Sequence, residues 1–187
     1  MAEEIHGIVG SSGRAAEVDD GGLRVNPRTA FEQAVIDGRA FAWAGLTEDA
    51  TAHDTLLALE NNSPTDVLKI HKLIVTTDNT SQIQVFTASG VTPATTDGAA
   101  VVGVNLNRAS GRSANATCYT DDTGNTEQGS SYPGKILTQV IIAATPTEIL
   151  FDGAVALLED HMVGVDLTTA STSNANATFI GWFEPIS

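Results

Sequence analysis

The residues of this chain that could bind a cation gather in one stretch, residues 121–127 (DDTGNTE). Carboxylate, hydroxyl and amide oxygens are the ligands that a hard cation such as Ca²⁺ prefers. The spacing differs from that of an EF-hand loop, so we interpret the stretch as a solvated loop, with a Ca²⁺ site as the alternative. A second acidic stretch, residues 19–22 (DDGG), is typical of a plain turn.

The four histidines are His6, His53, His71 and His161, and no two have the spacing with which a helix or hairpin clamps zinc. His53 precedes Asp54 in a polar link, where a capping or surface role is expected. His161 follows Glu159 and Asp160 in an expected hairpin turn, which leaves a pH-dependent switch as an alternative. We therefore predict no metal site.

Nucleophilic chemistry finds no support in the sequence. There is no GxSxG elbow, and no phosphate-binding GxxxxGK[ST] or GxGxxG motif. The one cysteine, Cys118, has no visible catalytic partner and is expected to be a small buried group in a strand. Adjacent carboxylates such as Glu159 and Asp160 would point to opposite faces of a strand. We predict no catalytic residues, no cofactor and no enzymatic activity.

The charge of the chain excludes some partners. The 187 residues carry 23 acidic and 9 basic side chains, a formal net charge of -14, and the lysines are Lys69, Lys72 and Lys135 only. No basic stripe can neutralise phosphates, so we expect neither nucleic-acid binding nor docking on an anionic membrane. The N-terminus lacks a secretory signal and no apolar run is long enough for a membrane helix, so we expect a soluble protein made in the cytoplasm.

The spacing of apolar residues divides the chain in two. Residues 1–38 are rich in glycine and charge, and we predict an extended N-terminal arm with room for one short helix over residues 27–37. In this arm Val18, Leu23 and Val25 are the predicted partner-binding residues, since a short strand can pair with another molecule. Residues 39–187 contain about ten short runs of period two, separated by Gly, Asn, Asp and Pro. They predict an all-β domain, a jelly-roll-like antiparallel β-sandwich.

Alternation along these runs predicts which side chains face the core. Phe41 and Trp43 share one face of the first strand. Leu68 and Ile70 share a face, and Lys69 and His71 share the opposite, polar face. Residues 148–153 and 154–160 are expected to be two strands, and residues 99–107 one. Near the C-terminus we expect Ile180 and Trp182 to face inward and to pack against Trp43 or Phe41, with the first and last strands of the domain paired.

The order of these features resembles the virion structural proteins of tailed viruses, in the class of head-decoration, minor head or fibre proteins. The similar parts are an arm (residues 10–25, GSSGRAAEVDDGGLRV), a first strand (residues 38–45), a strand pair (residues 55–75), the segment 101–117 and the closing segment 177–185 (ATFIGWFEP). The resemblance implies a jelly-roll-like fold, assembly as a homotrimer or another small ring, a place on the capsid or tail exterior, and no catalytic residues. The implied partners are the major capsid protein or other virion proteins. The scarcity of lysine beside many acids departs from this pattern and suggests a halophilic or marine host.

Two other functions remain open on the sequence alone. A receptor- or carbohydrate-binding sandwich would need an exposed aromatic platform, whereas aromatic residues make up 5% of the chain and both tryptophans lie on core-like strands. A sugar-modifying or hydrolytic jelly roll would need a metal or an assembled catalytic group. Asn61, Asn79, Asn115 and Asn176 each begin an N-x-[ST] triplet, which would matter only in a host that glycosylates proteins.

Overall fold

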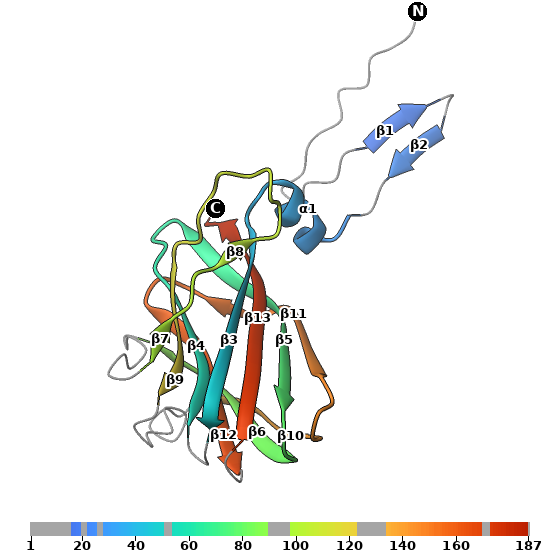
Figure 1. The fold of residues 1–187 in the computed structure, drawn as a ribbon. Helices are drawn as coiled ribbons and strands as arrows, with labels where there is room; N and C mark the ends of the chain where they lie inside the picture. The colour runs from blue at the N-terminus through green and yellow to red at the C-terminus, as the bar shows by residue number, and fades with distance from the viewer. Residues whose placement is uncertain are drawn as a thin grey trace, which may run out of the picture.

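The computed structural model of the protein describes residues 16–19, 22–25, 28–50, 54–89, 98–122, 134–169 and 173–186. Most of these residues are extended, and one short helix precedes the main group of strands. The strands form two large antiparallel sheets that face each other, and a separate two-stranded hairpin lies at the N-terminal end (Figure 1). No helix in these ranges is long and apolar enough to span a membrane.

The front sheet, which is nearer the viewer in Figure 1, has the strand order β11-β5-β13-β3-β8. Every neighbouring pair in it is antiparallel. Its strands are β3 (Ala40–Ala50), β5 (Asp66–Thr77), β8 (Val104–Asn105), β11 (Thr147–Leu157) and β13 (Ser173–Pro185). The first and last strands of the sandwich, β3 and β13, are paired as predicted, with Trp43 opposite Phe179.

The back sheet has the strand order β10-β6-β12-β4-β9-β7 and is also antiparallel throughout. Its strands are β4 (Thr55–Asn61), β6 (Ser81–Ser89), β7 (Ala99–Ala100), β9 (Ala116–Asp122), β10 (Gly134–Ile141) and β12 (His161–Thr169). The predicted strand at residues 99–107 is therefore wrong, because β7 and β8 are two short strands that belong to different sheets.

The connections between the sheets are those of a jelly roll. Among the eight main strands the chain passes from one sheet to the other between β3 and β4, β4 and β5, β5 and β6, β10 and β11, β11 and β12, and β12 and β13. The four-strand set β3-β13-β5-β11 thereby faces β4-β12-β6-β10, and each pairing joins strands that are distant in the sequence. Eight strands in two such sheets define the jelly-roll architecture. The predicted all-β, jelly-roll-like fold is confirmed.

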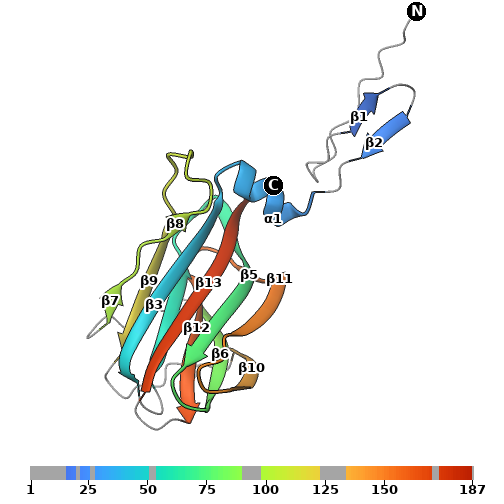
Figure 2. The ribbon, with the colours of Figure 1, turned by 45° about the vertical axis from the view of Figure 1, so that its right-hand side comes forward.

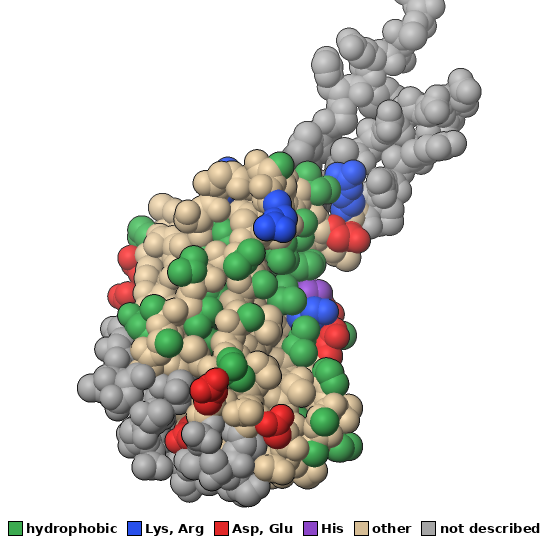
Figure 3. All heavy atoms as spheres, viewed as in Figure 1, with side chains coloured by type: hydrophobic (Ala, Val, Ile, Leu, Met, Phe, Trp, Pro, Cys, Tyr) green, Lys and Arg blue, Asp and Glu red, His purple; other side chains and the backbone are tan. Residues whose placement is uncertain are grey.

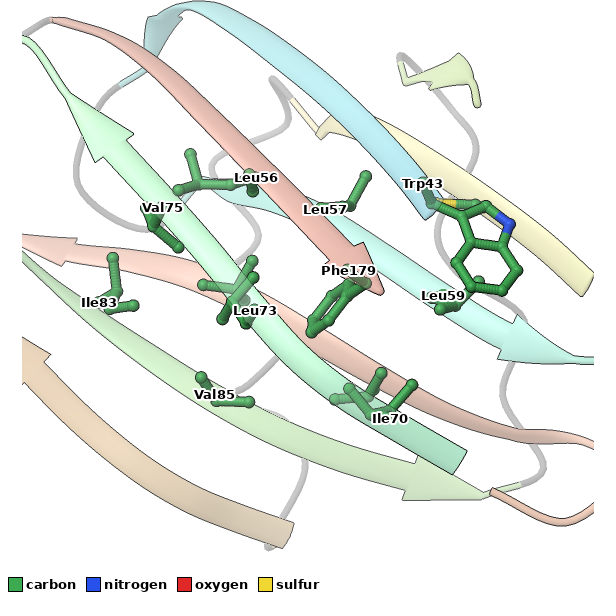
Figure 4. Close-up of a cluster of buried hydrophobic side chains, with 14 of the residues drawn as sticks. Trp43, Leu56, Leu57, Leu59, Ile70, Leu73, Val75, Ile83, Val85 and Phe179 are labelled. Carbon is green, nitrogen blue, oxygen red and sulfur yellow. The ribbon is translucent and has the colours of Figure 1, made fainter. Parts of the chain in front are cut away.

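Large apolar side chains fill the space between the sheets (Figure 4). Their alternation with outward residues follows from the two-residue period of a strand, which places every second side chain on the same face. Phe41 and Trp43 lie in this core, as do Leu68 and Ile70, so these face predictions are confirmed. Each fully buried side chain of this size stabilises the fold by about 1.5–3 kcal/mol. The fully buried members labelled in Figure 4 are Trp43, Leu56, Leu57, Leu59, Ile70, Leu73, Val75, Ile83, Val85 and Phe179.

The predicted faces of β13 are wrong. Phe179 and Phe183 point into the core, where the Phe183 ring lies edge-on to Phe41 at a centroid distance of 5.7 Å. Trp182 instead belongs to a separate small cluster with Ala34 and Ala40. The reason is that the helix before β3 covers this part of the outer face of the front sheet, so a tryptophan is buried there without entering the core. A register shift between Ile180 and Gly181 also interrupts simple alternation.

The prediction of two strands in residues 148–160 is also wrong. β11 is one strand that bends at Asp152 and Gly153, which have positive φ angles of 47° and 82°. Its pairing with β5 is interrupted between Leu150 and Val155. A bulge within one strand therefore replaces the turn that was expected between two strands. Glycine is suited to both conformations, so its presence did not distinguish them.

The N-terminal residues form two distinct elements. Strands β1 (Ala16–Asp19) and β2 (Gly22–Val25) pair with each other as an antiparallel hairpin. Helix α1 (Ala30–Ile36) begins with a capping box, in which Thr29 and Glu32 exchange hydrogen bonds of 2.7 and 3.1 Å. Its apolar side packs on the outer face of the front sheet through Ala34. We predicted residues 1–38 as one arm, whereas the contacts of α1 make this helix part of the sandwich.

Candidate functional site

A hollow of about 410 Å³ lies where α1 meets the outer face of the front sheet. Helix α1 supplies one wall, and strands β5, β11 and β13 supply the floor and the opposite wall. Its volume falls in the range of about 300–1,000 Å³ that is usual for small-molecule sites. The described lining residues are Thr29, Ala30, Phe31, Lys69, His71, Asp152, Gly153 and Trp182.

Three rings give the hollow a rigid apolar side. The ring of Phe31 stacks on the imidazole of His71, with centroids 4.1 Å apart and an angle of 13° between the planes. Trp182 meets both rings edge-on, at 5.8 Å from Phe31 and 6.4 Å from His71. Offset stacking and edge contacts of this kind add about 0.5–1.5 kcal/mol to the burial of the rings. They hold α1 against the sheet and fix the shape of the hollow.

The bend in β11 forms the opposite wall. A Cβ atom added to Gly153 would lie 2.7 Å from Cη2 of Trp182, so only glycine allows the strand to approach the indole this closely. The positive φ of Gly153 has the same requirement. The bend also turns the Asp152 side chain toward His71, and their Oδ1 and Nδ1 atoms are 3.1 Å apart.

Ion pairs surround the hollow. Lys69 pairs with Glu184, and Lys72 pairs with Glu148 at 3.0 Å between Nζ and Oε1. The two lysines of β5 therefore face carboxylates on β13 and β11 and do not form a positive patch. Figure 3 shows a histidine close to basic and acidic side chains at the right of this face, with further acidic side chains at its left edge and lower end, while the middle of the sheet is mainly hydrophobic or uncharged.

The hollow combines a polar pair with an apolar wall. The His71 and Asp152 pair resembles the base and orienting carboxylate of a hydrolase, but such a pair needs a nucleophile within hydrogen-bond reach. Among the described lining residues the one hydroxyl is that of Thr29. Its oxygen accepts a hydrogen bond from the backbone N–H of Glu32 and so caps the start of α1. The hollow offers instead an apolar wall and a few polar atoms, which is the composition of a recognition site.

Comparison with known proteins adds no family to this geometry. No family model, curated protein or solved structure matches the chain.

The predicted partner-binding residues lie in the hairpin. Val18 is opposite Leu23 in the β1 and β2 pairing, and Val25 is opposite Ala16. Their predicted role in binding a partner therefore remains a prediction.

The predicted absence of a metal site concerns residues that the structure describes only in part. Within the described ranges, no group of three or more His, Cys, Asp and Glu side chains could hold an ion. Asp121 and Asp122 end strand β9, and the rest of the acidic stretch 121–127 lies outside the described residues, as do His6 and His53. The Nδ1 atom of His161 lies 2.9 Å from the carbonyl oxygen of Glu159, so this ring has a hydrogen-bond partner in the adjacent backbone.

Cys118 is buried in β9 as predicted, and burial raises the pKa of its thiol far above the usual range. Asn61 is also fully buried, and its Nδ2 atom donates to the carbonyl oxygens of Asp66 and Leu157, each at 2.9 Å. A glycan cannot be attached to this amide in the folded protein. The Asn61 side chain, which begins the first of the four N-x-[ST] triplets, therefore has a structural role.

The hollow itself was not predicted from the sequence. Its residues come from distant parts of the chain, separated by up to 153 positions from Thr29 to Trp182, so no local motif joins them. One signal was present, because Thr29 and Glu32 have the spacing of a capping box and mark the start of α1. The position of His71 opposite Leu68 and Ile70 was read correctly as a polar face, but its aromatic neighbours come from other parts of the chain.

Proposed function

We propose that this protein is a non-enzymatic structural component of a tailed-virus particle, placed on the capsid exterior. In this role it binds the major capsid protein or another virion protein, and neighbouring copies of itself. The observation that carries the proposal is the N-terminal hairpin, which lies apart from the sandwich in both ribbon views (Figures 1 and 2).

The hairpin has the properties of an element that a partner completes. Its strands have four residues each and pair with each other only, among the strands of the described structure. An isolated two-stranded hairpin is marginally stable in water at best, and a third strand or an apolar surface stabilises it. An adjoining subunit can supply either one by pairing with an edge of the hairpin.

The fold agrees with this role and with one other. Jelly rolls build both viral capsid domains and lectin domains, so the architecture alone does not choose between shell binding and glycan binding. The charge of -14 supports a protein surface as the partner, because it disfavours phosphate-rich ligands. The helix α1 anchors the base of the arm, which favours a separate attachment element outside the sandwich.

The test is deletion of residues 1–26. This deletion leaves Thr29 and Glu32 in place, so the capping box of α1 and the sandwich remain intact. We expect the shortened protein to keep its strand-rich circular dichroism spectrum and its melting temperature, and to lose co-purification with virus particles. A matched variant replaces Val18, Leu23 and Val25 by serine in the full chain. Unchanged occupancy on particles for both variants would refute the proposal.

A second function, recognition of a receptor glycan, is favoured by the hollow between α1 and the front sheet. The apolar wall formed by Phe31 and the polar atoms of Asp152 and Lys69 are the two kinds of group that sugar binding requires. Glycan-array binding by the full chain, lost in Phe31→Ala and kept in Gly111→Ala, would support it. An array without binding would remove this candidate.

A further inference from the structure

Strand β10 is an unprotected edge of the back sheet. It pairs with β6 on one side, and no described strand pairs with its other side. Figures 1 and 2 place β10 and β11 along the same side of the sandwich, where both sheets end. An edge strand presents a row of unpaired N–H and C=O groups, which form hydrogen bonds with any strand that approaches in register.

The side chains of this edge are unusual for a surface. Ile136, Val140 and Ile142 are 42%, 52% and 63% exposed. Together with Thr138 they are the even-numbered positions of the segment, and all four are β-branched, the residue type best suited to a strand. Leu137 and Ile141 face the interior. The exposed row therefore has the composition of a buried sheet.

The usual protections of an edge are largely missing here. Proline and inward-facing charges are the common devices that prevent edge-to-edge pairing. Strand β10 contains no proline, and Lys135 is its one charged residue. A bulge lies between Lys135 and Leu137, at one end of the strand, so no bulge interrupts residues 137–141, where the exposed Gln139 amide donates to the Val140 carbonyl oxygen at 3.1 Å.

We propose that two copies of this chain pair through β10, antiparallel to each other, about a two-fold axis. The two back sheets then form one continuous sheet across the contact. In an antiparallel pairing about a two-fold axis, the residue numbers of any two opposite residues add up to the same sum. When this sum is even, both opposite residues are even-numbered or both are odd-numbered, so their side chains lie on the same face of the joined sheet. Every register with an even sum therefore places the β-branched row of one copy beside the same row of the other copy. With a sum of 276, Ile136 faces Val140 of the second copy, and Thr138 faces Thr138.

The charge of β10 and the symmetry of the contact favour a second copy as the occupant. A protein with a net charge of -14 repels its own copies over most of its surface. Strand β10 carries no acidic residue, so two copies that pair through it bring no carboxylates of this strand together. The contact is also isologous, which means that one strand supplies both halves of the interface and no separate complementary surface is needed.

This inference rests on the self-association in the proposed function and names the surface that provides it. It fails independently of attachment to a particle, because attachment was assigned to the hairpin and is measured on particles. Self-association through β10 is measured on the isolated chain in solution.

The first experiment is sedimentation equilibrium of the full chain and of Val140→Lys. We expect the natural chain to have the mass of two copies or a multiple of two. In the register above each introduced lysine faces Ile136 of the second copy, so a charge without a partner replaces an apolar side chain twice in the contact, and the dissociation constant should rise on the order of a hundredfold. The matched control is Val102→Lys, at a valine that is 82% exposed in the segment between β7 and β8, and it should associate as the natural chain does.

A second measurement locates the register without relying on the lysine variant. Cysteine is introduced singly at positions 137 to 140, and disulfide formation between copies is followed after mild oxidation. The natural Cys118 is buried and gives no background in the folded chain. A two-fold contact predicts rapid cross-linking at the position nearest the axis and slow cross-linking at the others.

The outcomes separate clearly. A paired mass that Val140→Lys disrupts and Val102→Lys leaves intact, with cross-linking that peaks at one position of β10, supports the inference. A monomer at the highest attainable concentration would overturn it. A trimer or other assembly that is insensitive to Val140→Lys, or equal cross-linking at all positions, would overturn it as well.

Discussion

Replacement of Gly153 by alanine tests the bend that shapes the candidate site. Gly153 has a φ of 82°, and an added Cβ would lie 2.7 Å from Cη2 and 3.1 Å from Cζ2 of Trp182. The indole cannot easily move away, because Trp182 is 4% exposed and packs against Ala34 and Ala40. The new methyl group must therefore displace either the strand or the ring.

The expected loss follows from these two effects. A left-handed backbone costs a non-glycine residue roughly 1–2 kcal/mol. Insertion of a methyl group into a packed contact costs typically about 1–3 kcal/mol. The smaller entropy of the unfolded alanine chain returns about 0.4–1 kcal/mol. We expect Gly153→Ala to lower the free energy of unfolding by about 2–4 kcal/mol.

Urea unfolding, followed by circular dichroism, measures this loss. Gly111→Ala is the matched control, since a Cβ at Gly111 meets nothing within 4 Å and its φ is not positive. The control should change the free energy of unfolding by less than about 0.5 kcal/mol. Equal stability of the two variants would refute the reasoning, because it would mean that the bend and the indole contact do not constrain each other.

Four further predictions concern the core, buried groups and charge. Phe179→Ala removes a fully buried ring and should lower the free energy of unfolding by about 3–5 kcal/mol in the same assay; a loss under 1 kcal/mol would contradict its place between the sheets. Burial, and then the nearby Asp160 carboxylate, raise the pKa of Glu60 in the folded protein. The charged side chain therefore destabilises the fold above this raised pKa, and the destabilisation is lost as the pH falls below the usual value of 4.5, where Glu60 is protonated in both states. Glu60→Gln should thus be the more stable protein at neutral pH and equal to the natural one below pH 4.5, as pH-dependent urea titrations would show; a constant difference would be the contrary result. The buried thiol of Cys118, with its raised pKa, should react with a thiol reagent only after unfolding, and fast labelling of the folded protein would contradict this. Finally, if the excess of acids is an adaptation to salt, the melting temperature should rise with salt concentration, since salt screens the repulsion of a chain with charge -14; a melting temperature that does not rise would count against a halophilic host.

The strands and most of the core could be predicted because they depend on local patterns. The strand pair predicted over residues 55–75 lies close to the observed bounds of β4 and β5, and the alternation of Leu68 and Ile70 with Lys69 gave the inward face of β5. The first strand was assigned its inward face correctly from Phe41 and Trp43. A two-residue period is sufficient for this purpose wherever a strand is regular.

The errors occur where a strand is irregular or where another element covers its outer face. Gly153 indicated a turn, yet the same residue type permits a bend inside one continuous strand. Trp182 was assigned to the core from its alternation with Phe179 and Gly181, but α1 gives it a different buried environment on the outer face. The hollow and the free edge of β10 depend on the order of strands in the sheets, and that order is a property of the whole chain, which no local pattern reveals.

The pairing of β3 with β13 determines when this protein can become stable. The first strand of the sandwich acquires its main partner only after residues 173–185 have been synthesised. Contacts between such distant parts of a chain form slowly, typically in milliseconds to seconds for all-β domains. During synthesis the N-terminal hairpin and α1 leave the ribosome well before the sandwich closes, so for that interval the residues that later anchor the arm have no sheet to dock on.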